Sequence, residues 1–194
     1  MPSFRDPEMW QAFYRGTLRA RRFGIRVIEY RVDPRRIQLF CEAKDPKELE
    51  RSFKSLCTTL AIAAKRVYLK RFDRKHEGAV FLDRFHLQLC DSPERVRWAL
   101  RQVIAGGRDA VARPRLLGRS SALTFPMWKW TQIFEAGDGG RASLDARVRS
   151  SRDRLAARLG PRLGDLERQA TEITASPQFR LTREAWLQDP KAGE

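Results

Sequence analysis

The chain has 194 residues, of which 42% are hydrophobic and 10% aromatic, which is enough for a folded core and excludes a disordered chain. Its 39 Lys and Arg against 24 Asp and Glu give a net charge of +15, which favours a polyanionic partner; a general enrichment in arginine is the alternative explanation. No stretch has the length of a membrane span or a secretion signal, and the three widely spaced cysteines fit neither a disulfide framework nor a zinc site. We therefore expect a cytoplasmic, bacterial protein without a membrane partner.

The first part of the chain predicts a helix followed by a β-hairpin. The helix is expected over residues 7–22 and a strand rich in β-branched and aromatic residues over 25–32. A turn at 33–35 leads into a second strand over 36–43. Alternation in that strand places two sets of side chains on opposite faces. One face carries Ile37, Leu39, Cys41 and Ala43, and the other carries Arg36, Gln38, Phe40 and Glu42.

A long amphipathic helix follows the hairpin. Asp45 is a typical N-cap, and the apolar residues behind it keep helical spacing to about residue 69. After a basic loop over 70–78, alternating residues predict a third strand over 79–90. Another helix begins at residue 92 and is expected to end before two consecutive glycines.

The remainder of the chain differs in composition. An aromatic stretch covers residues 123–134, and helices are expected over 143–159 and 163–173, with a third beginning near Thr182. We therefore divide the chain into two parts.

The first part, residues 1–110, is predicted to be an α+β domain. The order helix, strand, strand, helix, strand, helix favours an antiparallel sheet with helices packed on one face. The second part, residues 111–194, is predicted to be a basic, aromatic-containing, mostly helical extension.

Three blocks of residues 1–110 carry a resemblance to a known family. Residues 22–32 and 37–43 resemble the central hairpin of REP-associated tyrosine transposases, members of the HUH superfamily of single-strand nucleases. The segment Phe81-Leu82-Asp83-Arg84-Phe85-His86 is similar to the family's aromatic-x-Asp-Arg-Tyr/Phe-His motif, and residues 92–100 resemble the start of its tyrosine-bearing helix. The resemblance implies a ferredoxin-like HUH core.

The residues that would perform the family's chemistry are replaced in this chain. Active members bind a divalent metal through two histidines on the second strand, and a tyrosine on the late helix attacks the phosphate. Arg36 and Gln38 stand at the positions of the two histidines, and Arg35 stands at the position of an Asn that precedes them in the family. Gln102 stands near the position of the tyrosine. Arginine cannot ligate a metal and glutamine is not a nucleophile. We therefore expect a non-catalytic protein without a metal or cofactor.

The resemblance also implies a strand before the first helix, for which this sequence shows no residues. A partner chain, a second copy or the C-terminal extension could supply it, because an open sheet edge tends to pair.

Positive charge at the replaced positions suggests that this surface grips phosphates directly. A basic cluster around the end of the long helix and an aromatic–cation pair in the extension suggest further contacts. Each group has an alternative explanation. The arginines could simply lie exposed at the hairpin turn, the basic cluster could be a solvated charged face, and the aromatic residues could belong to the core or to a protein interface. A fourth basic group lies on the helix over 143–159, at Arg147, Arg149, Arg152, Arg154 and Arg158. The candidate nucleic-acid-binding residues are Arg35, Arg36, Gln38, Lys65, Arg66, Lys70, Arg71, Arg74, Lys75, Arg84, His86, Trp128, Lys129 and Trp130.

The leading hypothesis is a transposase-like domain that binds hairpin or single-stranded nucleic acid, DNA or RNA, without cleaving it. A structural subunit of a larger complex is the alternative, in which the same surfaces contact protein. An active nuclease with a relocated site is the third hypothesis.

Overall fold

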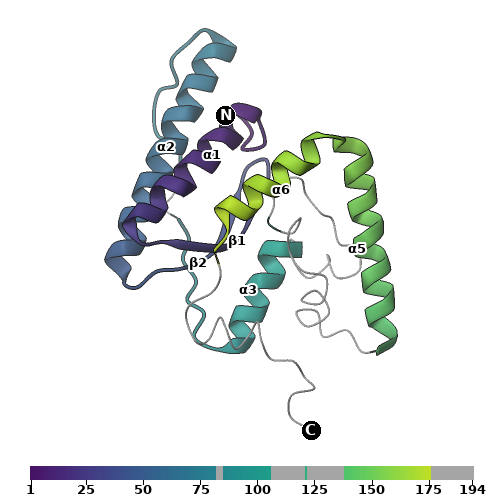
Figure 1. Cartoon of the computed structure of the whole chain (residues 1–194). Coiled ribbons are helices and arrows are strands. Elements are labelled where there is room, and N and C mark those ends of the chain that lie inside the picture. Colours follow the sequence, from purple (N-terminus) through teal and green to yellow (C-terminus); the bar gives the residue numbers. More distant parts are fainter. Residues whose placement is uncertain (82–84, 106–120, 122–137, 176–194) are drawn as a thin grey trace.

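The computed structural model describes residues 1–81, 85–105, 121 and 138–175 (Figure 1). A two-stranded antiparallel sheet lies at the centre, with helices around it. The elements in chain order are α1 (Pro7–Ala20), the 3-10 turn η1 (Arg21–Phe23), β1 (Arg26–Val32), β2 (Ile37–Glu42), α2 (Pro46–Phe72), α3 (Pro93–Ala105), α5 (Asp138–Leu159) and α6 (Arg162–Ile173). The predicted α+β class and the β-hairpin are confirmed.

The hairpin is closed by a tight turn and contains one irregularity. The backbone N–H of Asp33 donates to the carbonyl of Arg36 at 2.8 Å. The register shifts between Val27 and Glu29, so Ile28 is an extra residue in β1. Such a bulge breaks the strict alternation of faces. It lets β1 direct apolar side chains to both sides of the sheet.

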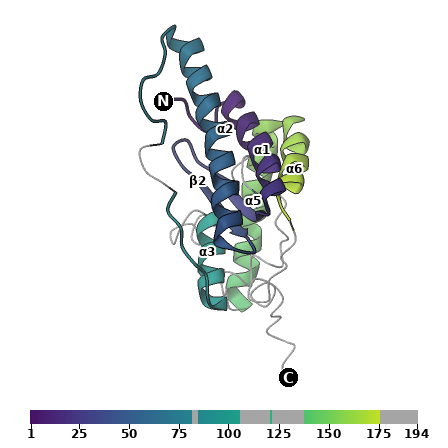
Figure 2. The same cartoon turned by 90° about the vertical axis from the view of Figure 1, so that its left-hand side faces the viewer.

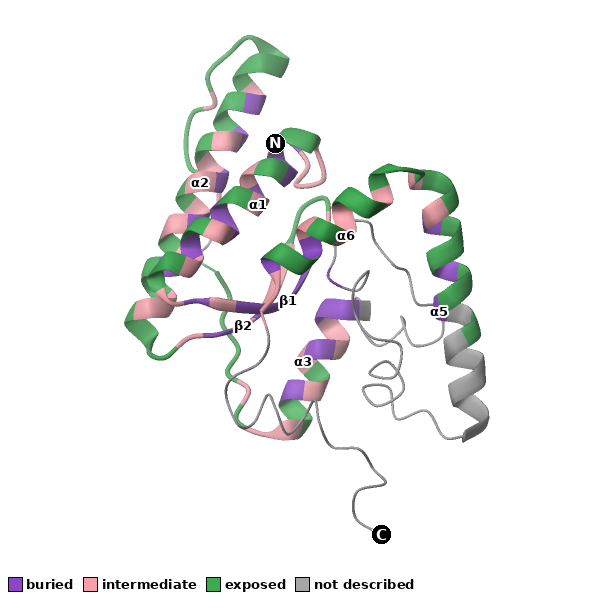
Figure 3. Cartoon of the chain, viewed as in Figure 1, coloured by how far each residue is buried: buried purple, intermediate pink, exposed green. Residues whose placement is uncertain are grey.

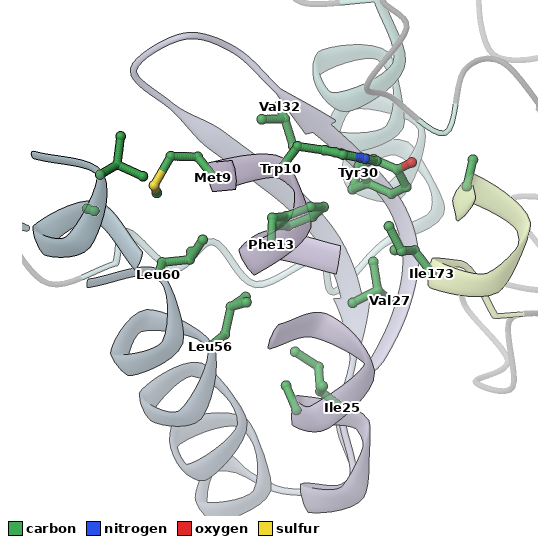
Figure 4. Packing of buried hydrophobic residues seen from close by; sticks show 14 residues of the cluster. Met9, Trp10, Phe13, Ile25, Val27, Tyr30, Val32, Leu56, Leu60 and Ile173 are labelled. Atoms are coloured by element: carbon green, nitrogen blue, oxygen red, sulfur yellow. The ribbon is translucent and has the colours of Figure 1, made fainter. Parts of the chain in front are cut away.

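One face of the sheet packs against α1 and α2 through a large apolar cluster (Figure 4). The rings of Phe13 and Tyr30 are 5.4 Å apart, and both side chains are fully buried. Gly16 lets the two helices approach closely, because a Cβ there would lie 2.9 Å from the Leu56 side chain. Cores of this kind supply most of the free energy of folding.

Helix α2 begins as its sequence predicts. The Asp45 carboxylate accepts from the backbone N–H of Glu48 at 2.8 Å, and the Glu48 carboxylate accepts from that of Lys44 at 3.1 Å. These two bonds satisfy donors that a helix start would otherwise leave open. The helix continues to Phe72, three residues further than expected, and ends at Asp73, whose φ is 49°.

The expectation that helices cover only one face is wrong. Ile28 and Phe40 point to the second face, where they form a separate cluster with α3 and α5. In Figure 3 the inner side of α3 is correspondingly buried. Phe40 and Glu42, which alternation places on the face opposite Ile37, are 8% and 4% exposed. A second helical layer therefore covers this end of the face.

The third strand expected over residues 79–90 is also wrong for the described part of that segment. Residues 79–81 and 85–90 contain no strand, and no backbone hydrogen bond joins them to β2. Aromatic contacts hold the segment instead: Phe81 stacks on Phe4 at 6.2 Å and Phe85 on Phe53 at 4.6 Å. Alternation defines two faces, but a strand also needs a neighbouring backbone to complete its hydrogen bonds.

Beyond residue 110, the described residues pack on both faces and on the outer edge of β1. Helix α6 buries Ala170 and Ile173 against α1, and α5 contributes Val148 and Leu155 to the α3 cluster. The hydroxyl of Ser121 accepts from the N–H of Tyr30 at 2.8 Å and donates to its carbonyl at 3.1 Å. The N–H of Ala175 donates to the carbonyl of Val27 at 2.8 Å.

The extension thus contacts the edge where a missing strand was expected, through single residues rather than a strand in the described segments. Helix α5 begins five residues before the expected 143, and α6 starts one residue before the expected 163. The aromatic stretch over 123–134 and the helix expected near Thr182 lie outside the described residues.

Candidate nucleic-acid interface

A single carboxylate organises the cations of the hairpin turn. Asp33 lies 3.1 Å from the guanidinium of Arg5, 3.2 Å from that of Arg31 and 3.7 Å from that of Arg36. The Arg36 side chain is 63% exposed, and Arg35 beside it is also exposed. Three guanidinium groups around one carboxylate leave net positive charge at the turn, so this surface is able to attract a phosphate.

The residues at the metal-ligand and nucleophile positions implied by the resemblance lie in different surroundings. Gln38 lies opposite Arg31 across the hairpin, on the face that packs against α3, and Arg31 reaches the carbonyl of Ile104 at 3.5 Å. Gln38 is half-buried and its Oε1 atom has no hydrogen-bond partner among the described groups. Gln102 is half-buried on α3. The buried guanidinium of Arg31 therefore occupies the space between the hairpin and the end of α3.

Two tyrosines, Tyr14 and Tyr30, lie in environments that favour the neutral phenol. Burial raises the pKa of Tyr30 far above its ordinary value. Tyr14 donates a hydrogen bond to Glu172, and this bond raises its pKa as well. No group of three or more His, Cys, Asp or Glu with the arrangement of a metal site occurs in the residues that the structure describes.

The largest concentration of cations is at the end of α2, which extends beyond the other helices in both views (Figures 1 and 2). We call residues 65–76 the α2 tip. Glu8 pairs with Lys70 at 2.8 Å, and Asp6 pairs with Arg71 at 3.1 Å. The exposed cations Lys65, Arg66 and Lys75 have no acidic partner in the described structure. These three are therefore available to an external anion.

Aromatic rings lie between these cations. The ring of Tyr68 is 4.7 Å from that of Phe72 and meets His76 edge-on at 5.1 Å. Arg74 lies over the Tyr68 ring at 5.9 Å and donates to its hydroxyl at 3.2 Å. Phe72 is 52% exposed. These rings are not among the candidates predicted from the sequence, although Tyr68 and Phe72 are four residues apart among Lys and Arg, the spacing that brings helix side chains together.

The N-terminal segment joins the α2 tip to the hairpin turn. Arg5 pairs with Asp33 of the turn, while the next residue, Asp6, pairs with Arg71 of the α2 tip. The backbone N–H of Phe4 also donates to the carbonyl of Pro34 at 2.9 Å. Residues 4–6 therefore link two basic groups that are about thirty residues apart in sequence. We call this combined surface the basic end.

A second basic surface lies on α3. Glu94, Arg95, Arg97, Trp98 and Arg101 line an open hollow of about 420 Å³. Four of them recur at i, i+3, i+4 and i+7, which is one face of a helix. This spacing could have identified the surface from the sequence, where the helix was considered only as the counterpart of a tyrosine-bearing helix.

The remaining candidates are dispersed. His86 is exposed in the segment after Phe85. On α5, Arg152 pairs with Glu167 at 2.8 Å, while Arg149, Arg154 and Arg158 are exposed. The residues outside the described structure are Arg84, Trp128, Lys129 and Trp130, together with the side chain of Arg147.

Comparisons of the chain with family models, curated proteins and solved structures found no match. In the part of the chain that the structure describes, no helix combines the length and apolar character needed to cross a bilayer.

Proposed function

We propose that this protein binds hairpin or single-stranded nucleic acid through the basic end and does not cleave it. The observation that carries the proposal is the meeting of the hairpin turn and the α2 tip across Arg5 and Asp6. Cations spread over one continuous surface attract a polyanion more strongly than the same charges dispersed, and each phosphate contact releases a counterion.

The aromatic side chains of the α2 tip support nucleic acid over other polyanions. Phe72 presents about half of its surface to solvent beside the three unpaired cations. An aromatic ring next to a cation is suited to a base and its phosphate.

Three features support binding without scission. Arg36 and Gln38 stand at the positions that the resemblance assigns to metal ligands, and Gln102 near that of the nucleophile. The guanidinium of Arg31, held by Asp33 and the Ile104 carbonyl, adds a fixed positive charge beside Gln38. A fixed cation disfavours a divalent metal by repulsion.

Descent from a tyrosine transposase is part of this proposal. The helix, hairpin and long helix occur in the order that the resemblance implies. The helices on both faces and the unpaired segment over 85–90 depart from it.

An accessory role in a protein complex is the second candidate. Phe85, Leu87 and Leu89 are 42%, 48% and 73% exposed in succession, and such an apolar run suits a protein contact.

The test is a titration of fluorescently labelled hairpin, single-stranded and duplex oligonucleotides, in DNA and RNA, followed by anisotropy at several salt concentrations. The variant Lys65→Gln/Arg66→Gln/Lys75→Gln removes the unpaired cations of the α2 tip. Its matched control, Lys47→Gln/Arg51→Gln/Lys54→Gln, removes three exposed cations from the first half of the same helix. A rise of 1.5 Å per residue places Lys65 and Arg66 about 16–29 Å along the helix from the control positions.

The α2-tip variant is expected to lower the slope of log K against log salt by about 2, because each lost contact with a single strand removes about 0.7. At about 0.1 M salt this corresponds to roughly 100-fold weaker binding. The control variant is expected to change the slope by less than one contact. Undetectable binding of every probe at low salt would refute the proposal, and metal-dependent nicking with a covalent adduct would refute the absence of cleavage.

A further inference from the structure

The outward face of α3 carries a large aromatic side chain that the core does not use. Val96, Leu100, Val103 and Ile104 face inward and are at most 6% exposed. Trp98 points away from them and is 40% exposed. The inward face of α3 is already filled by apolar side chains, so the partly exposed Trp98 is available for a ligand.

The surroundings of Trp98 form an open, shallow and positively charged hollow on one face of α3. Three arginines and one glutamate line the hollow, whose volume of about 420 Å³ falls within the roughly 300–1,000 Å³ of small-ligand sites. Arg95 pairs with Asp91 at 2.9 Å, but the two side chains are 58% and 67% exposed. Exposed ion pairs of this kind are weak, so Arg95 can exchange its carboxylate for a phosphate at little cost.

We propose that this hollow binds one unpaired nucleobase, stacked on the Trp98 indole, with the flanking phosphates on Arg95 and Arg97. The inference rests on the proposed function and defines its substrate as a strand with at least one unpaired base. A base inside a duplex has both faces covered by its neighbours, whereas an unpaired base offers a face to an aromatic ring.

The two surfaces then contribute differently to binding. The cations of the basic end contact phosphates, and these contacts act on duplex and single strand alike. The α3 hollow adds stacking energy for the single strand only. Loss of one base–aromatic stack weakens binding by about 5- to 150-fold.

The experiment compares the full-length protein with Trp98→Ala, Trp98→Phe and Phe23→Ala. Phe23 is also 40% exposed but lies in the 3-10 turn after α1, so it is the matched control for loss of an exposed ring. The probes are labelled oligo-dT, a hairpin that is labelled on its paired stem, and a fully paired duplex of the same length. Dissociation constants and salt slopes are measured by anisotropy.

Trp98→Ala is expected to weaken oligo-dT binding by about 5- to 150-fold, to leave duplex binding and the salt slope unchanged, and to be largely rescued by Trp98→Phe. Phe23→Ala should change neither affinity. Unchanged oligo-dT affinity in Trp98→Ala, or an equal loss for duplex, would overturn the inference. So would an oligo-glutamate peptide that competes for Trp98 as well as oligo-dT does. Failure of the wild type to bind either probe would instead remove the proposed function itself.

Discussion

Ile173 joins the C-terminal helix to the core formed by the first half of the chain. Its side chain is 0% exposed at the end of α6 and packs in the cluster that contains Phe13 and Tyr30. Ile173→Ala removes three carbon atoms, worth about 0.8 kcal/mol each in transfer free energy. The cavity left behind adds to this loss, so we expect a decrease of about 2–5 kcal/mol in the free energy of unfolding.

The assay is urea and thermal unfolding followed by circular dichroism. For a chain of this length the loss corresponds to a fall in Tm of about 5–15 °C. The control is Thr171→Ala, an exposed position two residues earlier, where a change within about 0.5 kcal/mol is expected. A single, shifted transition is predicted, because α6 shares its core with α1. Two separate transitions, or a loss of less than about 0.5 kcal/mol in Ile173→Ala, would refute this account and support independent parts divided near residue 110.

Two further predictions concern local environments. Gly24→Ala should lower the free energy of unfolding by about 1–3 kcal/mol in the same assay. The reason is that φ at Gly24 is 104° and that a Cβ there would lie 2.5 Å from the Glu48 carboxyl that caps α2. Unaltered stability would show that alanine is not strained at this position. Burial raises the pKa of the Cys41 thiol from 9.0 to about 12, so the folded protein keeps a proton that the unfolded chain releases, and stability should fall as pH rises from about 9 to 12. Burial also raises the pKa of Cys57. Iodoacetamide at pH 9 should alkylate Cys57 before Cys41, and the reverse order in mass spectrometry would contradict the buried environment of Cys41.

The elements predicted correctly from the sequence are those whose determinants are local. Helix α2 could be located because Asp45, the following proline and the apolar spacing lie within one stretch of chain. The hairpin could be located because its turn and both strands are consecutive. In each case the residues that form the hydrogen bonds are the residues that carry the pattern.

The errors concern partners that are distant in sequence. Alternation over residues 79–90 satisfied one condition for a strand, but the backbone that would pair with it cannot be inferred from the segment itself. The bulge at Ile28 depends on the register with β2, and it gives the sheet a second apolar face that simple alternation does not predict.

The candidate interface shows the same division. The cations of the α2 tip could be identified as a group, since they lie within eleven consecutive positions. Their connection to the hairpin turn depends on Arg5 and Asp6 facing different partners, which no local pattern reveals. Trp98 was readable from helical spacing, yet its exposure depends on which face of α3 the sheet covers.

The contacts of Ser121 and Ala175 with β1 have a consequence for synthesis of the protein. The residues of β1 leave the ribosome long before Ser121 and Ala175, and Ala175 follows Val27 by more than a hundred residues. At about 5–20 residues per second this leaves the Val27 carbonyl without its partner for roughly 7–30 s. During that interval the unpaired edge can pair with a strand of another nascent chain on a neighbouring ribosome. Slowing translation between these positions should therefore raise the fraction of chains that aggregate before folding is complete.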